Sequence, residues 1–439
     1  MRARPASAGP TASAAEAAAK ISPARRVAFD ILTLVGEGSS HSDELLHSER
    51  TDLLTPEDRN LATALVMGVL RWQIALDARV AKLLARPDQR LAEPVALALR
   101  MGAFQLLHMD RIPPHAVLNE SVELCRAAGQ PHAAGMVNAV LRKLAAAQKP
   151  SARIFESPAA FAERLGHPRW LVERWVAAYG RESALAICEY DQREPQAGQH
   201  FAHATETATL PQMDDGSRLV AELAAAALPA LGERTPHVWD CCAAPGDKTL
   251  ILAHRLAGAE ILATDASKRR LGAMKARMRR FPFADAVRCE VLDAAAVEGS
   301  AAFDLILCDV PCSGTGTLAR NPEIRHRLRT EDMARQAERQ RAILSGALRR
   351  LAPGGRLVYS TCSLEPEENE RVVEAVAAEA GVQRLPIGPL IAGLAEAGVV
   401  QQVACDDLLA SAVKDGALRT LPGSHAYDGF FAVVLERTT

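Results

Sequence analysis

Apolar residues return at helical spacing through the first third of the chain, from about residue 22 to residue 147. Thr55 followed by Pro56 is typical of a helix start, with threonine as the N-cap and proline at the first helical position. Since strand-like alternation does not occur in this stretch, it predicts an all-α bundle over 22–148, after a leader (1–21) that we expect to be disordered. The helices are predicted at 26–35, 61–72, 97–107, 116–127 and 135–144.

Near Asp214 the pattern changes to short apolar or β-branched runs that alternate with helical segments. This alternation predicts a Rossmann-like α/β domain over 214–439, doubly wound around a mostly parallel sheet. The predicted strands are 238–241, 260–264, 287–292, 304–308 and 356–360, and the predicted helices are 248–256, 268–280 and 331–351. The region between the domains, 149–213, contains a predicted helix at 168–190 and a polar stretch, Arg193–Pro211, interpreted as a linker or loop.

The composition is that of an ordinary soluble protein, with 49% hydrophobic and 24% charged residues among 439. No run approaches the roughly 18 uncharged apolar residues of a membrane span. The nine cysteines form no C-x-x-C pair, so we expect neither a disulfide scaffold nor a zinc site, and the cytoplasm is the expected location. The net charge of −2 means that any polyanion has to be bound by a local patch.

One such patch covers residues 268–280, where seven basic residues occur without an acid. It is either an RNA-binding surface or simply the solvated face of a helix, and the sequence leaves both interpretations open. The candidate RNA-binding residues are Lys268, Arg269, Lys275, Arg277, Arg280 and, further along the chain, Arg320.

Ligands of doubly wound sheets bind at the carboxyl ends of the strands, and unusual residues follow the strands here. The loop after the first strand, 241–249, has small side chains and one glycine, which allow a ligand close to the backbone. The next strands end at Asp265, Asp293 and Asp309. Singly each aspartate is more often a helix N-cap, but together they favour an adenosine-type ligand without a pyrophosphate, S-adenosylmethionine rather than NAD.

Two cysteines, Cys312 and Cys362, follow the fourth and fifth strands, so neighbouring strands would bring both thiols to one cleft. A thiolate that adds to C6 of a pyrimidine makes C5 nucleophilic enough to take a methyl group. Asp309 is placed to orient such a base at N3 and N4. Five other cysteines are interpreted as inert and buried: Cys125, Cys188, Cys289, Cys308 and Cys405.

Several segments resemble known families. The N-terminal segments LATALVMGVLRW, LRMGAFQLLHMDRIPPHAVLNESVEL and GMVNAVLRKL are similar to the NusB family of RNA-binding helical domains, although these helices could equally serve only as a core. The segments DCCAAPGDKT, ATDAS, LILCDVPCSGTGTLARNPEIRHRL, YSTCSLEPEENERVV and LPGSHAYDGFFAVVLER resemble the ordered motifs of the RsmB/NOP/Sun family of RNA (cytosine-5)-methyltransferases.

This resemblance implies roles for individual residues. Cys362 would be the nucleophile, Cys312 would assist product release, and Lys248 would orient a carboxylate, either that of the methionine moiety or Asp309. The residues that would bind S-adenosyl-L-methionine are Cys242, Ala243, Ala244, Pro245, Gly246, Asp247, Lys248, Asp265, Asp293 and Asp309.

The resemblance further implies methylation of a 16S rRNA cytosine, the family's cytosine 967, by a monomer without a metal or a membrane. A tRNA methyltransferase and a non-catalytic RNA-binding assembly factor are the alternatives, and the presence of both cysteines speaks against the second. The chain departs from the family pattern at Asp247, where a second glycine is usual, and at His326, where tryptophan is common. The stretch 193–211 is also shorter than the family's RNA-binding subdomain there, so 149–213 would be an abbreviated form of it.

Overall fold

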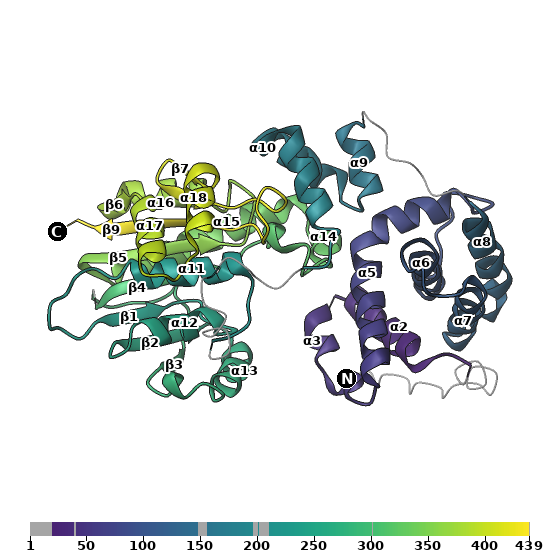
Figure 1. Ribbon diagram of the computed structural model, residues 1–439, viewed down its shortest axis with the longest axis horizontal. Helices are drawn as coiled ribbons and strands as arrows, with labels where there is room; N and C mark the ends of the chain where they lie inside the picture. The colour runs from purple at the N-terminus through teal and green to yellow at the C-terminus, as the bar shows by residue number, and fades with distance from the viewer. Residues whose placement is uncertain are drawn as a thin grey trace, which may run out of the picture. The chain divides into compact units, whose positions relative to one another are not determined.

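The computed structural model describes residues 20–38, 41–147, 156–195, 201, 210–300 and 302–438. Nearly all of the predicted leader and most of the stretch 193–211 lie outside these residues. The chain forms two compact units (Figure 1): a helical unit of residues up to Gln192 together with Asn321–Arg327, and an α/β unit of Arg193–Arg320 and Leu328–Thr439. The exact boundaries of the intervening region 149–213 stay predictions.

The helical unit confirms the predicted bundle, and each of the five predicted helices is present. Leu65, Val69, Leu99 and Leu141 are fully buried at its centre, as the three-to-four-residue spacing requires. Thr55 accepts a hydrogen bond from the backbone N–H of Asp58 (3.2 Å), which confirms the predicted N-cap. The helices are α2 (Pro23–Gly36), α3 (Ser42–Leu46), α4 (Glu49–Asp52), α5 (Pro56–Ala81), α6 (Glu93–His108), α7 (Pro114–Ala127), η1 (Pro131–Ala133), α8 (Ala134–Ala146), α9 (Pro158–Arg164) and α10 (Arg169–Tyr190).

Helix α5 is the one described helix that is long and apolar enough to cross a membrane, with a mean hydropathy of 1.3 over its best window. Half of that window is buried inside the protein. Leu65, Val66, Val69 and Leu70 of this helix belong to the bundle core, so its apolar face is used in packing.

The α/β unit contains a mostly parallel sheet, which confirms the predicted fold class. Its strand order is β3-β2-β1-β4-β5-β9-β8-β7, with β6 also paired to β9. Strands β1 to β5 are parallel, whereas β9 runs antiparallel to β5. The strands are β1 (His237–Asp240), β2 (Glu260–Asp265), β3 (Arg288–Val291), β4 (Phe303–Asp309), β5 (Leu351–Thr361), β6 (Val382–Leu385), β7 (Val413–Lys414), β8 (Ala417–Arg419) and β9 (Phe431–Arg437).

Both faces of this sheet are buried, because successive residues of each central strand enter different cores. Val238 and Leu305 lie in one core with Ile391, whereas Trp239 and Ile306 lie in the other. This double burial is why the central strands read as continuous apolar runs in the sequence. The helices of the unit are α11 (Asp215–Ala226), α12 (Asp247–Arg255), α13 (Lys268–Met278), η3 (Pro282–Ala284), η4 (Thr315–Thr317), α15 (Thr330–Arg349), α16 (Glu370–Ala380), α17 (Gly388–Glu396) and α18 (Gln402–Ser411).

Residues 321–327 follow η4 but pack within the helical unit, which the sequence did not indicate. The Arg325 side chain, in the short helix α14 (Ile324–Arg327), is 2% exposed and donates to the carbonyls of Arg71 and Gly166, both at 3.1 Å. His326, the departure from the family pattern, donates from Nε2 to the carbonyl of Leu70 (2.7 Å). Burial lowers the pKa of His326 to about 4, so the ring is a neutral packing group.

Candidate active site

The two predicted active-site cysteines come together at the carboxyl edge of the sheet. Strands β4 and β5 are parallel neighbours with Asp309 opposite Ser360, so their following loops run side by side. The Sγ atoms of Cys312 and Cys362 are 3.4 Å apart, and both side chains are half-buried. The sequence prediction of two thiols in one place is therefore matched by the geometry.

The Cys312 thiol is held in its protonated form. The contact with Cys362, followed by burial, raises the pKa of the Cys312 thiol well above its ordinary value. A protonated Cys312 has a hydrogen that it can donate to the sulfur of Cys362, 3.4 Å away.

Lys248 contacts Asp309, which was one of the two partners predicted for it. Its Nζ lies 2.7 Å from Asp309 Oδ2, and Ser360 donates from Oγ to Asp309 Oδ1 (2.7 Å). Burial opposes the charge on Lys248, but the Asp309 carboxylate, helped by Cys362, outweighs it and raises the pKa of Lys248. A fixed cation and a fixed carboxylate therefore lie beside the cysteine pair.

Asp240, at the end of β1, holds the loop that was predicted to bind the cofactor. It accepts hydrogen bonds from Thr249 Oγ1 (2.7 Å) and from the backbone N–H of Cys242, so it joins both ends of the loop. Burial raises the pKa of this carboxyl group to about 7. Sequence reasoning had not selected Asp240, although it opens the DCCAAPGDKT motif.

Glycine is required at position 246, where the loop turns into α12. Gly246 has φ 106°, and a Cβ atom there would lie 2.8 Å from Cγ of Met274. Asp247, which stands where the family usually has a second glycine, is the first residue of α12 and pairs with Arg277 of α13 (2.6 Å). The departure is thus accommodated by an ion pair.

The two other strand-end aspartates differ from each other. Asp265 is buried, accepts from the backbone N–H of Ser267 (2.8 Å) and pairs with Arg270 (3.3 Å), which also donates to the carbonyl of Ala244 (2.6 Å). Asp293 is exposed and accepts from the backbone N–H of Ala295 (3.0 Å). A loop of small residues beside a buried carboxylate, both at the carboxyl edge, fits an adenosine-type ligand at Asp265 more closely than at Asp293.

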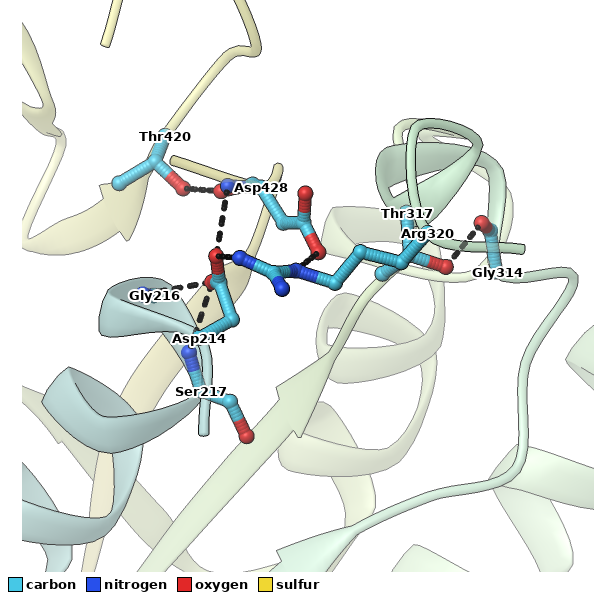
Figure 2. Close-up of polar contacts among 8 residues, drawn as sticks. All are labelled: Asp214, Gly216, Ser217, Gly314, Thr317, Arg320, Thr420 and Asp428. Atoms are coloured by element: carbon cyan, nitrogen blue, oxygen red, sulfur yellow. Dashed lines mark hydrogen bonds and ion pairs between the residues drawn. The ribbon is translucent and has the colours of Figure 1, made fainter. Parts of the chain in front are cut away.

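Arg320, a candidate RNA-binding residue, lies between two carboxylates of the α/β unit (Figure 2). Its Nη2 is 2.8 Å from Asp214 Oδ1, and its Nε is 3.0 Å from Asp428 Oδ2. Asp214 also caps α11 through the backbone N–H of Gly216 (2.8 Å). Arg320 therefore joins the segment after Cys312 to the start of α11 and to the loop before β9.

Gly316 packs directly against the backbone of the Cys362 loop. Its N–H donates to the carbonyl of Cys362 (2.9 Å), and its own carbonyl accepts from Gly429 (2.8 Å). A Cβ atom at position 316 would lie 2.3 Å from the carbonyl oxygen of Gly429 and 2.9 Å from that of Cys362. A side chain at position 316 would have to displace the backbone of Gly429 and Cys362, which is costly because backbone atoms cannot move aside as a flexible side chain can.

We expect Gly316→Ala to lower the free energy of unfolding of the α/β unit by about 1–3 kcal/mol. The matched control is Gly272→Ala in α13, where nothing lies within 4 Å of an added Cβ atom. The control should be neutral or slightly stabilising, because alanine is the better helix former. Urea denaturation compares the two variants, and equal midpoints would contradict the packing argument.

The remaining predicted residues occupy varied positions. Lys268, Arg269 and Lys275 are exposed along α13, and Arg280 is exposed in the turn that follows it. Arg277 forms an ion pair with Asp247. Four of the five cysteines interpreted as inert are buried, and Cys289 is half-buried. Glu368 and Asn369, which hold the cysteine loops as described below, were missed, although the acidic run after Cys362 was a visible signal.

Comparison with known proteins agrees with this architecture. Residues 22–146 match the NusB family, and residues 229–436 match the 16S rRNA methyltransferase RsmB/F family. The chain is 31% identical to the ribosomal RNA small subunit methyltransferase B of Salmonella typhi, over 91% of this chain and 94% of that one. It is 29% identical to the probable ribosomal RNA small subunit methyltransferase B of Bacillus subtilis, over 94% and 98% of the two chains.

A solved structure, that of PH0851, shares the fold, with a TM-score of 0.71 at 20% identity over 95% of this chain and 99% of that one. This structural similarity shows the fold alone, whereas the sequence matches cover both units and show the family. The chain belongs to the RsmB family of small-subunit ribosomal RNA methyltransferases, whose methyl donor is S-adenosyl-L-methionine.

Proposed function

We propose that this chain methylates C5 of a cytosine in 16S rRNA, the family's cytosine 967, through a covalent bond between Cys362 and C6 of the ring. The observation that carries the proposal is the pair of cysteine sulfurs 3.4 Å apart at the carboxyl edge of the sheet. Methylation of a nitrogen or a hydroxyl needs no thiol, because those atoms carry their own lone pairs. Carbon 5 of a pyrimidine does need one.

The thiolate of Cys362 adds to C6, and the electrons of the C5–C6 double bond make C5 nucleophilic. S-adenosyl-L-methionine supplies the methyl group that C5 takes. The ring then loses its C5 proton to a base, and the electrons of that bond re-form the double bond and expel the Cys362 thiolate. Net, the C5–H bond and the sulfur–methyl bond of S-adenosyl-L-methionine are broken, a C5–methyl bond is formed, and S-adenosyl-L-homocysteine and one proton are released.

Three side chains support these steps. Cys312 lies 3.4 Å from the Cys362 sulfur, and its thiol would donate a hydrogen bond that stabilises the charge returning to Cys362 on release. Asp309, held by Lys248 and Ser360, orients the base at its N3/N4 edge. Lys248 places a positive charge near the Cys362 sulfur.

The cofactor is proposed to lie along residues 242–248, with the Asp265 carboxylate toward the ribose hydroxyls and Asp293 further out. The side chains of Cys242, Ala243 and Ala244 are small, with Cys242 half-buried and the two alanines buried. Pro245 is exposed beside them. Asp309 would then lie between the cofactor and the target base.

The exposed residues of α13 are proposed to contact RNA phosphates. Lys275→Glu with Arg280→Glu should weaken RNA binding and flatten its salt dependence by about 0.7 in log–log slope for each phosphate of single-stranded RNA that the variant no longer neutralises. Arg277 is left unchanged, because its partner Asp247 belongs to the cofactor loop. The control is the double charge reversal Arg384→Glu with Lys414→Glu near the opposite edge of the sheet. Equal losses of RNA affinity in the two double variants would mean that Lys275 and Arg280 are ordinary solvent-exposed residues without a specific role in RNA binding.

We further propose that the enzyme works as a monomer in the cytoplasm, on 16S rRNA before or during subunit assembly. Bisulfite sequencing of rRNA and tRNA from cells with and without the gene tests the substrate. Loss of one protected cytosine in 16S rRNA supports the proposal. Loss in a tRNA supports the alternative substrate, and no loss in either supports a non-catalytic assembly factor.

A further inference from the structure

The carboxylate of Glu368 contacts both cysteine loops. Glu368 is fully buried just before α16. It accepts hydrogen bonds from the backbone N–H of Ser313 (2.9 Å) and from the Ser313 hydroxyl, and also from the hydroxyl of Ser363. Ser313 follows Cys312 in the chain, and Ser363 follows Cys362, so one carboxylate joins the two residues next to the two reactive sulfurs.

Gln340 of α15 completes the hold on the Cys312 loop. Its side-chain N–H group donates to Glu368 (3.0 Å) and to the carbonyl of Pro311 (2.9 Å). Cys312 is thereby held from both sides, at Pro311 through Gln340 and at Ser313 through Glu368.

Asn369 holds the Cys362 loop through hydrogen bonds to the residues on either side of Cys362. Its side-chain oxygen accepts from the Thr361 hydroxyl, and its side-chain nitrogen donates to the carbonyl of Ser363 (2.8 Å). Thr361 and Ser363 flank Cys362. Glu368 is the group common to both arrangements, since its side chain receives donors from either loop.

A carboxylate suits this task better than an amide would. Its two oxygens only accept, so every surrounding N–H and O–H group can point inward, and hydrogen bonds to a charged acceptor are about twice as strong as neutral ones. A buried carboxylate is costly unless such donors satisfy it, and the donors here are fixed by the fold. The arrangement therefore resists separation of the two loops.

We propose that Glu368 is a positioning residue that sets the distance between the Cys312 and Cys362 sulfurs. It acts through the serines that follow each cysteine and does not touch the RNA or the cofactor. The inference rests on the proposed two-cysteine function for its catalytic meaning, but the distance itself is tested without any methyl transfer.

The test measures how strongly the full-length protein favours a Cys312–Cys362 disulfide in glutathione buffers. Oxidised glutathione accepts two electrons, the two thiols form one S–S bond, and two molecules of reduced glutathione are released. The equilibrium constant is the effective concentration of one thiol at the other, and mass spectrometry of alkylated peptides identifies the pair. Since a disulfide needs an S–S distance of about 2.05 Å, a pair held at contact distance should form it readily.

Glu368→Gln should lower this constant by about tenfold, because the amide presents a donor where the loops need an acceptor. Glu367→Gln is the matched control, the same change one residue earlier, where the carboxylate pairs with Arg371 (3.2 Å). If Glu368→Gln does not fold, Ser363→Ala takes its place in the test. Ser363→Ala removes one donor to the carboxylate and leaves Glu368 unchanged, so it should lower the constant by less than tenfold. A constant for Glu368→Gln, or for Ser363→Ala in its place, that equals or exceeds that of the wild type overturns the proposal.

Methyl-transfer kinetics then separate the two proposals. If Glu368 positions the thiols for catalysis, Glu368→Gln lowers kcat and leaves the KM for RNA within twofold of the wild type. If the glutathione constant falls but kcat does not, Glu368 sets the distance as proposed and the two-cysteine function is wrong.

Discussion

Cys362→Ala should abolish methyl transfer to RNA, by at least about a thousandfold, while S-adenosyl-L-methionine still binds. Without this sulfur no bond to C6 forms, and C5 stays too weak a nucleophile. We expect that Cys312 does not substitute, because burial and the nearby Glu368 still raise the pKa of its thiol after the contact with Cys362 is lost. Single-turnover transfer of a labelled methyl group measures the loss, and calorimetry measures cofactor binding.

The matched control for this variant is Cys289→Ala. Cys289 lies in β3, is half-buried, and is outside the pair of sulfurs. It should retain near-normal transfer. Activity in Cys362→Ala within tenfold of this control would contradict the role of Cys362.

Cys312→Ala should behave in the opposite way and accumulate a covalent complex between protein and RNA. The methyl group still transfers, but the Cys362 sulfur leaves C6 slowly without the hydrogen bond that stabilises its returning charge. The complex would migrate as a slow band in denaturing gels, with turnover reduced by about a hundredfold or more. If Cys362→Ala traps RNA and Cys312→Ala is simply inactive, the two roles are reversed.

Much of the fold could be predicted from local sequence pattern. The central strands β1, β2, β4 and β5 and the bundle helices have strong patterns, because each buries one or two faces, whereas β3 is mostly exposed. Strands β6 to β9 were not predicted. Their place depends on β9 pairing antiparallel with β5, which joins residues 70 to 80 positions apart, and a local sequence pattern cannot indicate so distant a partner.

The part of the candidate site that could be predicted consists of reactive residues at or just after the ends of strands. Cys312, Cys362 and Asp309 follow β4 and β5, so the fold rule alone brought them together. The supporting residues were not predictable, because their value depends on long-range partners. In the sequence, Glu368 is one acid among several, and only its contact with Ser313 in the structure distinguishes it. Arg320 is likewise one basic residue among many in the sequence, and its ion pairs with Asp214 and Asp428 are visible only in the structure.

The position of the segment 321–327 could not be predicted from the sequence either. Its sequence continues the motif that holds Cys312, yet Arg325 is buried in the helical unit. Only its partners, the carbonyls of Arg71 and Gly166, explain why an arginine stands there. His326 is likewise placed by a long-range partner, because its ring donates to the carbonyl of Leu70.

The most direct measurement identifies the atom that bonds to the RNA. A 16S rRNA fragment made with 5-fluorocytidine is incubated with the protein and S-adenosyl-L-methionine, because a fluorine on C5 cannot leave as a proton does and the adduct is retained. Peptide mass spectrometry then locates the attached nucleotide. We expect the nucleotide to be attached at Cys362. Attachment at Cys312 would exclude Cys362 as the nucleophile, and so would methylation of ordinary RNA without a trapped adduct on the fluorinated RNA.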